Sequence, residues 1–173
     1  MKHAPDSRNG VTAVPILGGV IILMLIVFFL MARWDSEEQL MRHQARLITA
    51  VEGRKWKKID AMMAADFTDN AGHDKAWALR EPREALRHFM TLTIAPKQPT
   101  FQVLYPKREG DPMTGTVSTW LHFDGNGTPF AHIIKDTANS TSDPFLFTWR
   151  KESWKPWDWK LVSISHPLLL QAP

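Results

Sequence analysis

The sequence predicts an α+β protein, with one N-terminal transmembrane helix followed by three helices packed on a curved antiparallel sheet. Three observations support this fold class. Residues 9–32 contain no charged side chain. Helix signals are concentrated in residues 36–93. Beyond Pro99, β-branched and aromatic runs alternate with turn residues, and helices followed by such a meander are typical of the α+β class.

The uncharged segment is long enough to span a bilayer. At 1.5 Å per residue, residues 11–31 form a helix of about 31 Å. Arg33 and Trp34 follow it, as expected at a membrane interface. We therefore expect a tail at 1–10 and a transmembrane helix at 11–33. A cleaved signal peptide is the alternative, although no small-residue cleavage site follows the apolar run.

The flanking charges bear on membrane orientation. Lys2 and Arg8 precede the apolar segment and favour a cytoplasmic N-terminus, which places the domain outside the cytoplasm. Arg33, Arg42 and Arg46 follow the segment and favour the opposite arrangement, so the alternative stays open.

Composition excludes several classes of function. The chain has 21 Lys and Arg against 18 Asp and Glu, and this small excess is too dispersed to predict nucleic-acid binding. The absence of cysteine excludes disulfides, thiolate catalysis and thiolate-bound metal. One basic cluster stands out, which we interpret as a solvated helix face, with a polyanion or lipid-headgroup site as the alternative. It consists of Arg54, Lys55, Lys57 and Lys58.

The first helix after the apolar segment begins at residues 36–39, whose sequence SEEQ is a capping box. Acidic residues in its first turn suit the helix dipole. Its apolar stripe consists of Leu40, Leu47, Ile48 and Val51. Gly53 is expected to end this helix.

Two further helices are predicted before the sheet. The second carries Trp56, Ile59, Met62 and Met63 on one side. Short extended pieces are expected at 66–70 and 76–80. The third helix is predicted to start at Pro82, a favoured first-turn residue. Its apolar face consists of Leu86, Phe89, Met90 and Thr93.

Five extended runs follow, each bounded by turn residues. They are residues 100–105, 113–123, 128–138, 144–150 and 157–165. The sequence DGNG at 124–127 predicts a hairpin between the second and third of these runs. The sheet is therefore expected to be an antiparallel meander.

Four tryptophans crowd into the last two runs and the turn between them. Alternate residues of a strand share a face, so two aromatic sets are expected to form one sheet face covered by the helices. The sets are Phe145, Phe147 and Trp149 on one strand, and Trp157, Trp159 and Leu161 on the next. Trp154 falls in the turn and is the candidate for an exposed contact residue.

Residues 50–69 (AVEGRKWKKIDAMMAADFTD) resemble the opening of the nuclear-transport-factor-2-like superfamily, also called SnoaL-like or cystatin-like. REAL at 83–86 and WKLVSI at 159–164 are similar to its third helix and closing strand. The resemblance covers about residues 36–166 and implies a cone, formed by helices over a bent sheet. It divides the remaining chain into a cone domain at 34–166 and a tail at 167–173.

The superfamily contains isomerases, dehydratases, cyclases and epoxide hydrolases, whose acids or histidines line the cone, and also non-catalytic carriers and assembly domains. Asp66, His122 and His132 are the candidate catalytic residues, although a capping or turn role explains Asp66 equally well. A two-residue hairpin turn would place His122 and His132 on opposite faces, so no metal site is predicted, whereas a three- or five-residue loop would reverse this. No cofactor motif is present.

Two functions remain. The first is a membrane-anchored, non-catalytic binding or assembly module. Its expected partners are the membrane through residues 11–33, another membrane protein or a second copy, and a small apolar ligand, but no nucleic acid and no cofactor. The second is an isomerase, dehydratase or hydrolase for a small apolar substrate, and it requires a His or Asp inside the cone.

Overall fold

The computed structural model describes residues 13–32, 35–153 and 155–171. The chain divides into two compact units, Met1–Asp35 and Ser36–Pro173. The first unit contains helix α1, Ala13–Ala32. Over the described residues, no helix is both long enough and apolar enough to cross a bilayer. The membrane segment predicted at 11–33 reaches beyond the described residues and stays a prediction.

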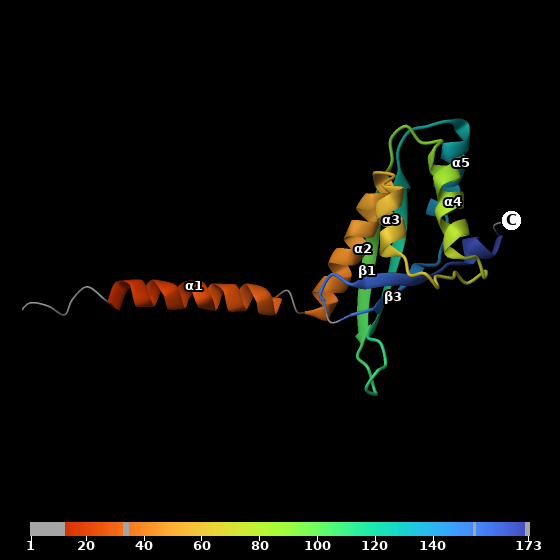
Figure 1. Ribbon diagram of the computed structural model, residues 1–173. Helices are drawn as coiled ribbons and strands as arrows, with labels where there is room; N and C mark the ends of the chain where they lie inside the picture. The colour runs from red at the N-terminus through yellow and green to blue at the C-terminus, as the bar shows by residue number, and fades with distance from the viewer. Residues whose placement is uncertain (1–12, 33–34, 154, 172–173) are drawn as a thin grey trace, which may run out of the picture. The chain divides into compact units, whose positions relative to one another are not determined.

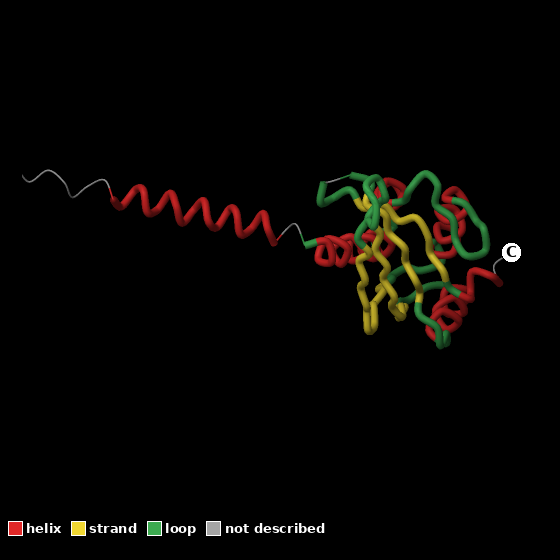
Figure 2. The backbone as a smooth tube through the Cα atoms, turned by 90° about the horizontal axis from the view of Figure 1, so that it is seen from below, coloured by secondary structure: helices red, strands yellow, loops and turns green. Residues whose placement is uncertain are grey.

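The second unit is an α+β domain, as predicted (Figure 1). Its helices are α2 (Ser36–Glu52), α3 (Trp56–Met62), α4 (Lys75–Leu86), α5 (Pro129–Asn139) and the 3-10 helix η1 (Pro167–Gln171). Its strands are β1 (Thr93–Leu104), β2 (Thr114–Asp124), β3 (Phe145–Lys151) and β4 (Trp159–Ser165). They form one antiparallel sheet in the order β1-β2-β3-β4, seen as a single layer in Figure 2.

Helix α2 confirms the predicted helix start and apolar stripe. It begins at Ser36, and Gly53 follows its last residue. Leu40 and Leu47 are buried in the main core, together with Ile59 of α3. The apolar spacing of α2 therefore fixes which side of the helix lies on the sheet.

The aromatic face of β3 and β4 forms the centre of the core. Trp149 and Trp159 are 0% and 1% exposed. Their indole N–H groups donate to the side-chain oxygens of the buried α2 residues Gln44 (3.0 Å) and Gln39 (3.2 Å). Each buried ring therefore has a partner for its one polar group, which such burial requires.

Trp157 was predicted to share the buried face, and this was wrong. It lies in the turn before β4 and is 64% exposed. Trp154, the predicted contact residue, lies outside the described residues.

Helix α4 corrects the prediction of an extended piece at 76–80 and of a helix start at Pro82. The Asp74 carboxylate accepts a hydrogen bond from the Trp77 backbone N–H at 2.9 Å, so the helix is capped there and begins at Lys75. Pro82 lies inside it. The helix ends at Leu86, and Met90, which was predicted to lie on its apolar face, is exposed beyond it.

Helix α5 corrects the prediction of a strand at 128–138. Thr128 and Pro129 suit a helix start, and Ala131, Ile134 and Ala138 recur at helical spacing. Ala131 packs against the buried Leu86 and Phe89 of the α4 end. This packing favours a helix, although Ile133 and Ile134 have high strand propensity.

The hairpin predicted at 124–127 is therefore a connection between β2 and α5. Several hydrogen bonds hold it against the chain beyond α4. The Met90 N–H donates to the Asn126 carbonyl at 2.7 Å, and the Thr128 N–H donates to the His88 carbonyl at 3.0 Å. Gly127 makes this approach possible, because a side chain there would collide with the backbone of residues 88 and 89.

The two outer strands of the sheet differ in detail. β1 begins at Thr93, earlier than predicted, and contains Pro96 and Pro99 around a bulge between Lys97 and Thr100. An edge strand tolerates these prolines. On the other side, residues 64–70 run along β4. Their backbone N–H groups donate to β4 carbonyls from Ala64 to Leu161, Thr68 to Val162 and Asn70 to Ile164.

Candidate functional site

An apolar cavity of about 240 Å³ lies between helices α2 to α4 and the inner face of the sheet. We call it the core cavity. Its helical wall is built from the apolar faces that the sequence predicts for α2 and α3. These residues are Leu47, Ile48 and Val51 of α2, Trp56 and Ile59 of α3, and Met63, which follows α3.

Helix α4 and the sheet complete the core cavity. The α4 wall consists of Ala78, Pro82, Ala85 and Leu86. The sheet side consists of Ile94, Leu121, Phe123, Phe147, Leu161 and Ile164. Because α4 starts earlier than predicted, its small residue Ala78 faces this space, and three helices border the cavity.

Within the described residues, no acidic, basic or hydroxyl side chain lines the core cavity. The surface that a bound molecule would meet is therefore hydrocarbon and aromatic. Such a surface supplies dispersion contacts and excludes water, but it supplies no group for proton transfer or nucleophilic attack. The arrangement suits ligand capture.

The structure places Asp66 away from the core cavity. Its two carboxylate oxygens each accept a hydrogen bond from the Arg150 guanidinium at 2.8 Å. The hydrogen bond from Arg150, with that residue's charge, lowers the pKa of Asp66. The Asp66 side chain is 64% exposed, so this pair ties the segment after α3 to β3 at the surface.

The two candidate histidines occupy different elements. His122 lies on β2, one residue from Leu121 and Phe123, and so faces away from the core cavity. His132 is exposed on α5. Among the described residues, no group of three His, Asp or Glu side chains is arranged to hold a metal ion. Asp66, His122 and His132 thus do not converge.

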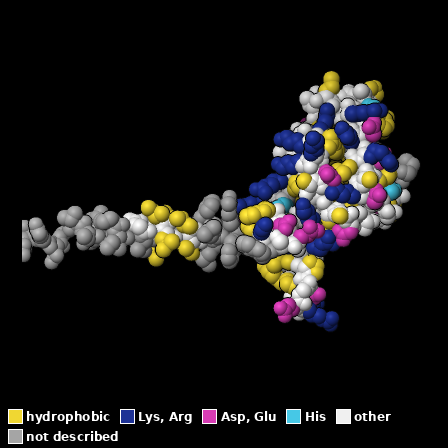
Figure 3. All heavy atoms as spheres, in the orientation of Figure 1, with side chains coloured by type: hydrophobic (Ala, Val, Ile, Leu, Met, Phe, Trp, Pro, Cys, Tyr) yellow, Lys and Arg dark blue, Asp and Glu magenta, His cyan; other side chains and the backbone are white. Residues whose placement is uncertain are grey.

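The basic cluster divides into two parts. The Arg54 guanidinium donates to the Phe89 backbone carbonyl and fixes the α2–α3 turn on the α4 end. Lys55, Lys57 and Lys58 are exposed. Figure 3 shows Lys and Arg side chains along the side of the domain where α2 and α3 lie. This placement agrees with a solvated helix face.

Sequence reasoning missed one polar cluster, in the loop before α4. The buried Asp69 carboxylate accepts from the backbone N–H of Ala71 and from both the backbone N–H and ring Nδ1 of His73, each at 2.9 Å. Burial raises the pKa of Asp69, but the hydrogen bonds from His73 and Ala71 outweigh it and the net shift is downward. The His73 ring stacks on Trp77 at 3.7 Å.

The comparisons with known proteins bear on the fold. No family model matches the chain, and no curated protein matches it. Three similar solved structures are an NTF2-like protein from Cytophaga hutchinsonii, a protein of unknown function with a cystatin-like fold from Nostoc punctiforme, and an NTF2-like protein of unknown function from Pseudomonas putida.

These similarities are weak in sequence. The Cytophaga protein is 15% identical with a TM-score of 0.49, over 73% of this chain and 92% of its own. The Nostoc protein is 13% identical with a TM-score of 0.48, over 73% and 86%. The Pseudomonas protein is 13% identical with a TM-score of 0.47, over 75% and 83%.

Proposed function

We propose that this chain is a membrane-anchored domain of the nuclear-transport-factor-2-like type that captures a small apolar molecule in the core cavity without transforming it. The observation that carries the proposal is the cavity wall, which is apolar at every described position. The aromatic residues Trp56, Phe123 and Phe147 and the branched aliphatic residues around them favour an uncharged hydrocarbon or aromatic ligand.

The size of the core cavity limits the ligand. An apolar cavity of roughly 150 Å³ holds benzene, whereas pockets for drug-sized molecules measure roughly 300–1,000 Å³. At about 240 Å³, the core cavity fits one substituted ring or a short branched chain. A fused polycyclic molecule would require the helices to move away from the sheet.

The alternative, an isomerase, dehydratase or hydrolase, requires an ionisable group inside the cone. The described lining of the core cavity contains none. Asp66 is paired with Arg150 at the surface, and His122 faces the other side of the sheet. No observation on these residues therefore favours acid–base chemistry on a molecule bound in the cavity.

A thermal-shift experiment with p-xylene tests ligand capture. The described core residues all lie within 36–173, so this unit carries its own core. The experiment therefore uses residues 36–173 without lipid. We expect p-xylene to raise Tm by several degrees, because a ligand that binds only the folded state stabilises it. Ala78→Leu fills the core cavity from α4, and we expect it to abolish the shift.

The matched control is Ala76→Leu, an exposed position on the same helix, which should leave the p-xylene shift unchanged. Circular dichroism establishes that both variants fold. Equal shifts in Ala78→Leu and Ala76→Leu, or no shift in the unsubstituted domain, would contradict capture in the core cavity.

The membrane anchor is a separate part of the proposal. Its support is the uncharged segment 11–31 and the interfacial pair Arg33 and Trp34. We further propose that the N-terminus is cytoplasmic. Alkaline carbonate extraction tests the anchor: the full chain should stay with the membrane pellet, and a chain starting at residue 34 should be released. Release of the full chain would refute it.

A further inference from the structure

A second hollow, of about 230 Å³, lies at the edge of β2. We call it the outer pocket; it is lined by Lys97, Gln98, Trp120, His122, Asn139 and Phe145, among others. β2 pairs with β3 only as far as Thr119 and Phe145. Beyond that point the Asn139 side chain accepts from the Phe123 N–H and donates to its carbonyl, both at 2.8 Å. Between the last β3 pairing and the Asn139 side chain, the edge of β2 has no neighbouring strand, and the pocket lies there.

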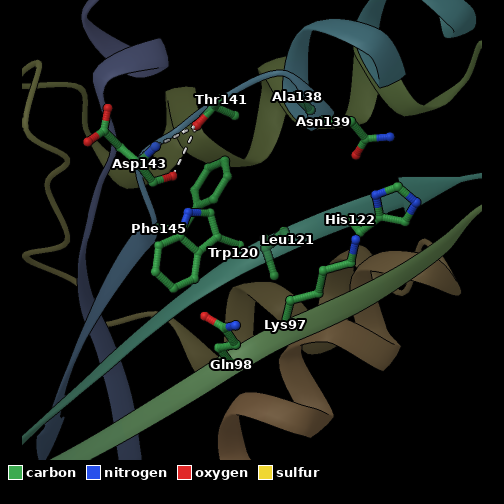
Figure 4. Close-up of a pocket in the computed structure, with 10 residues that line it drawn as sticks. All are labelled: Lys97, Gln98, Trp120, Leu121, His122, Ala138, Asn139, Thr141, Asp143 and Phe145. Carbon is green, nitrogen blue, oxygen red and sulfur yellow. Dashed lines mark hydrogen bonds between the residues drawn. The ribbon is translucent and has the colours of Figure 1, made fainter.

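The polar groups of the outer pocket gather at one end. Lys97 is the cross-strand partner of Trp120, which places it on the same face of the sheet as His122. Figure 4 shows the Lys97 side chain extending toward His122. Among the described residues, the side chains of Lys97, Gln98 and His122 have no hydrogen-bond or ion-pair partner, so their donors are available to a ligand.

The other end of the outer pocket is aromatic. The Trp120 indole N–H donates to the Ser142 carbonyl at 3.0 Å, which fixes the ring and leaves only its apolar surface exposed to the pocket. Phe145 stacks on the buried His166, with 3.9 Å between ring centroids. Trp120 and Phe145 both line this end of the pocket. In Figure 4 the Asp143 carboxylate points away from Lys97 and His122.

The backbone at the polar end is strained. Gln98 has φ 49°, in the left-handed region, within the bulge of β1, and it precedes Pro99, where this conformation is unfavourable. Strained residues persist only where the surrounding structure holds them, and they cluster at functional sites. The bulge also redirects side chains, and here it brings Lys97 and Gln98 to the same pocket rim.

We propose that the outer pocket is a second binding site, for a small carboxylate on a planar apolar body. Lys97 pairs with the carboxylate, Gln98 and His122 donate hydrogen bonds to it, and the ring lies against Trp120 and Phe145. One ammonium group matches one negative charge, whereas a phosphate dianion calls for more cations or a guanidinium. The carboxylate end distinguishes this ligand from the uncharged ligand of the core cavity.

Fluorine NMR on the full chain in nanodiscs of zwitterionic lipid tests the site, with 4-fluorobenzoate and its neutral analogue 4-fluorobenzamide as probes. We expect saturable line broadening of the benzoate, and affinity for the benzamide at least tenfold lower. Lys97→Met keeps the aliphatic stem and removes the charge, and it should weaken benzoate binding at least tenfold.

Lys107→Met, at an exposed position in the β1–β2 turn, is the matched control and should bind as the unsubstituted chain does. Ala78→Leu should also bind benzoate normally, which separates this site from the core cavity. Three results would overturn the proposal: no saturable broadening, equal affinity for the two probes, or unchanged binding in Lys97→Met.

Discussion

Replacing Trp149 by Ala is expected to lower the free energy of unfolding by about 3–5 kcal/mol. The ring is fully buried in the centre of the core, so its removal leaves a large cavity between α2 and the sheet. The change also removes the donor to the buried Gln44 side chain, which adds an unsatisfied polar group. The midpoint and slope of urea denaturation give the measurement.

Trp157→Ala is the matched control for this prediction. The residue type is the same and the position lies eight residues along the chain, but the side chain is exposed. Its truncation should change stability by no more than about 0.5 kcal/mol. If the two variants lost the same free energy, the aromatic residues of β3 and β4 would not form the core as described.

Gly127→Ala is expected to cost about 3 kcal/mol or more. A Cβ at residue 127 would lie 2.3 Å from the His88 carbonyl oxygen, 2.9 Å from Phe89 Cα and 2.7 Å from Ala131 Cβ. Two of these neighbours are backbone atoms, so no side-chain rotation relieves the overlap. The β2–α5 connection must then move away from the end of α4, and thermal unfolding should show the loss.

Gly110→Ala provides the comparison. Gly110 has φ +93° in the β1–β2 turn, and a Cβ there would meet nothing within 4 Å. Its substitution carries only the cost of a left-handed conformation, about 1–2 kcal/mol. Should Gly127→Ala prove no more damaging than Gly110→Ala, the close packing of residues 88–91 against 125–128 would be disproved.

The parts of the fold that the sequence predicts are those fixed by local chemistry. The capping box at Ser36 and the stripe from Leu40 to Val51 correctly predict α2, because each depends on spacing within one helix. The burial of Trp149 and Trp159 follows from strand alternation in the same way. Their glutamine partners on α2 are more than a hundred residues away, and no local pattern indicates them.

The wrong strand and helix-start predictions have two physical causes. In residues 128–138, strand propensity and a Gly-rich turn competed with a Thr-Pro helix start, and packing of Ala131 against Leu86 and Phe89 favours the helix. Residues 76–80 were predicted to be extended, but the Asp74 cap starts a helix there instead. Both cases show tertiary contacts or a cap overriding propensity.

The site was predictable only in part. The apolar faces of α2 and α3 anticipate one wall of the core cavity, but the α4 wall depends on where that helix starts. The outer pocket depends on strand register, since Lys97 meets Trp120 only through β1–β2 pairing across the bulge. The Asp66–Arg150 pair joins residues 84 positions apart, beyond the reach of any sequence motif.

The two edge strands of the sheet, β1 and β4, affect how two copies of the domain can associate. A free strand edge invites another strand to add to it, the route by which sheets polymerise. β4 already bonds to residues 64–70 along its outer side. β1 carries two prolines, a bulge and a lysine, which are the means by which natural sheets block such growth. At these two edges a second copy of this domain is therefore expected to meet the first through side chains rather than by strand addition.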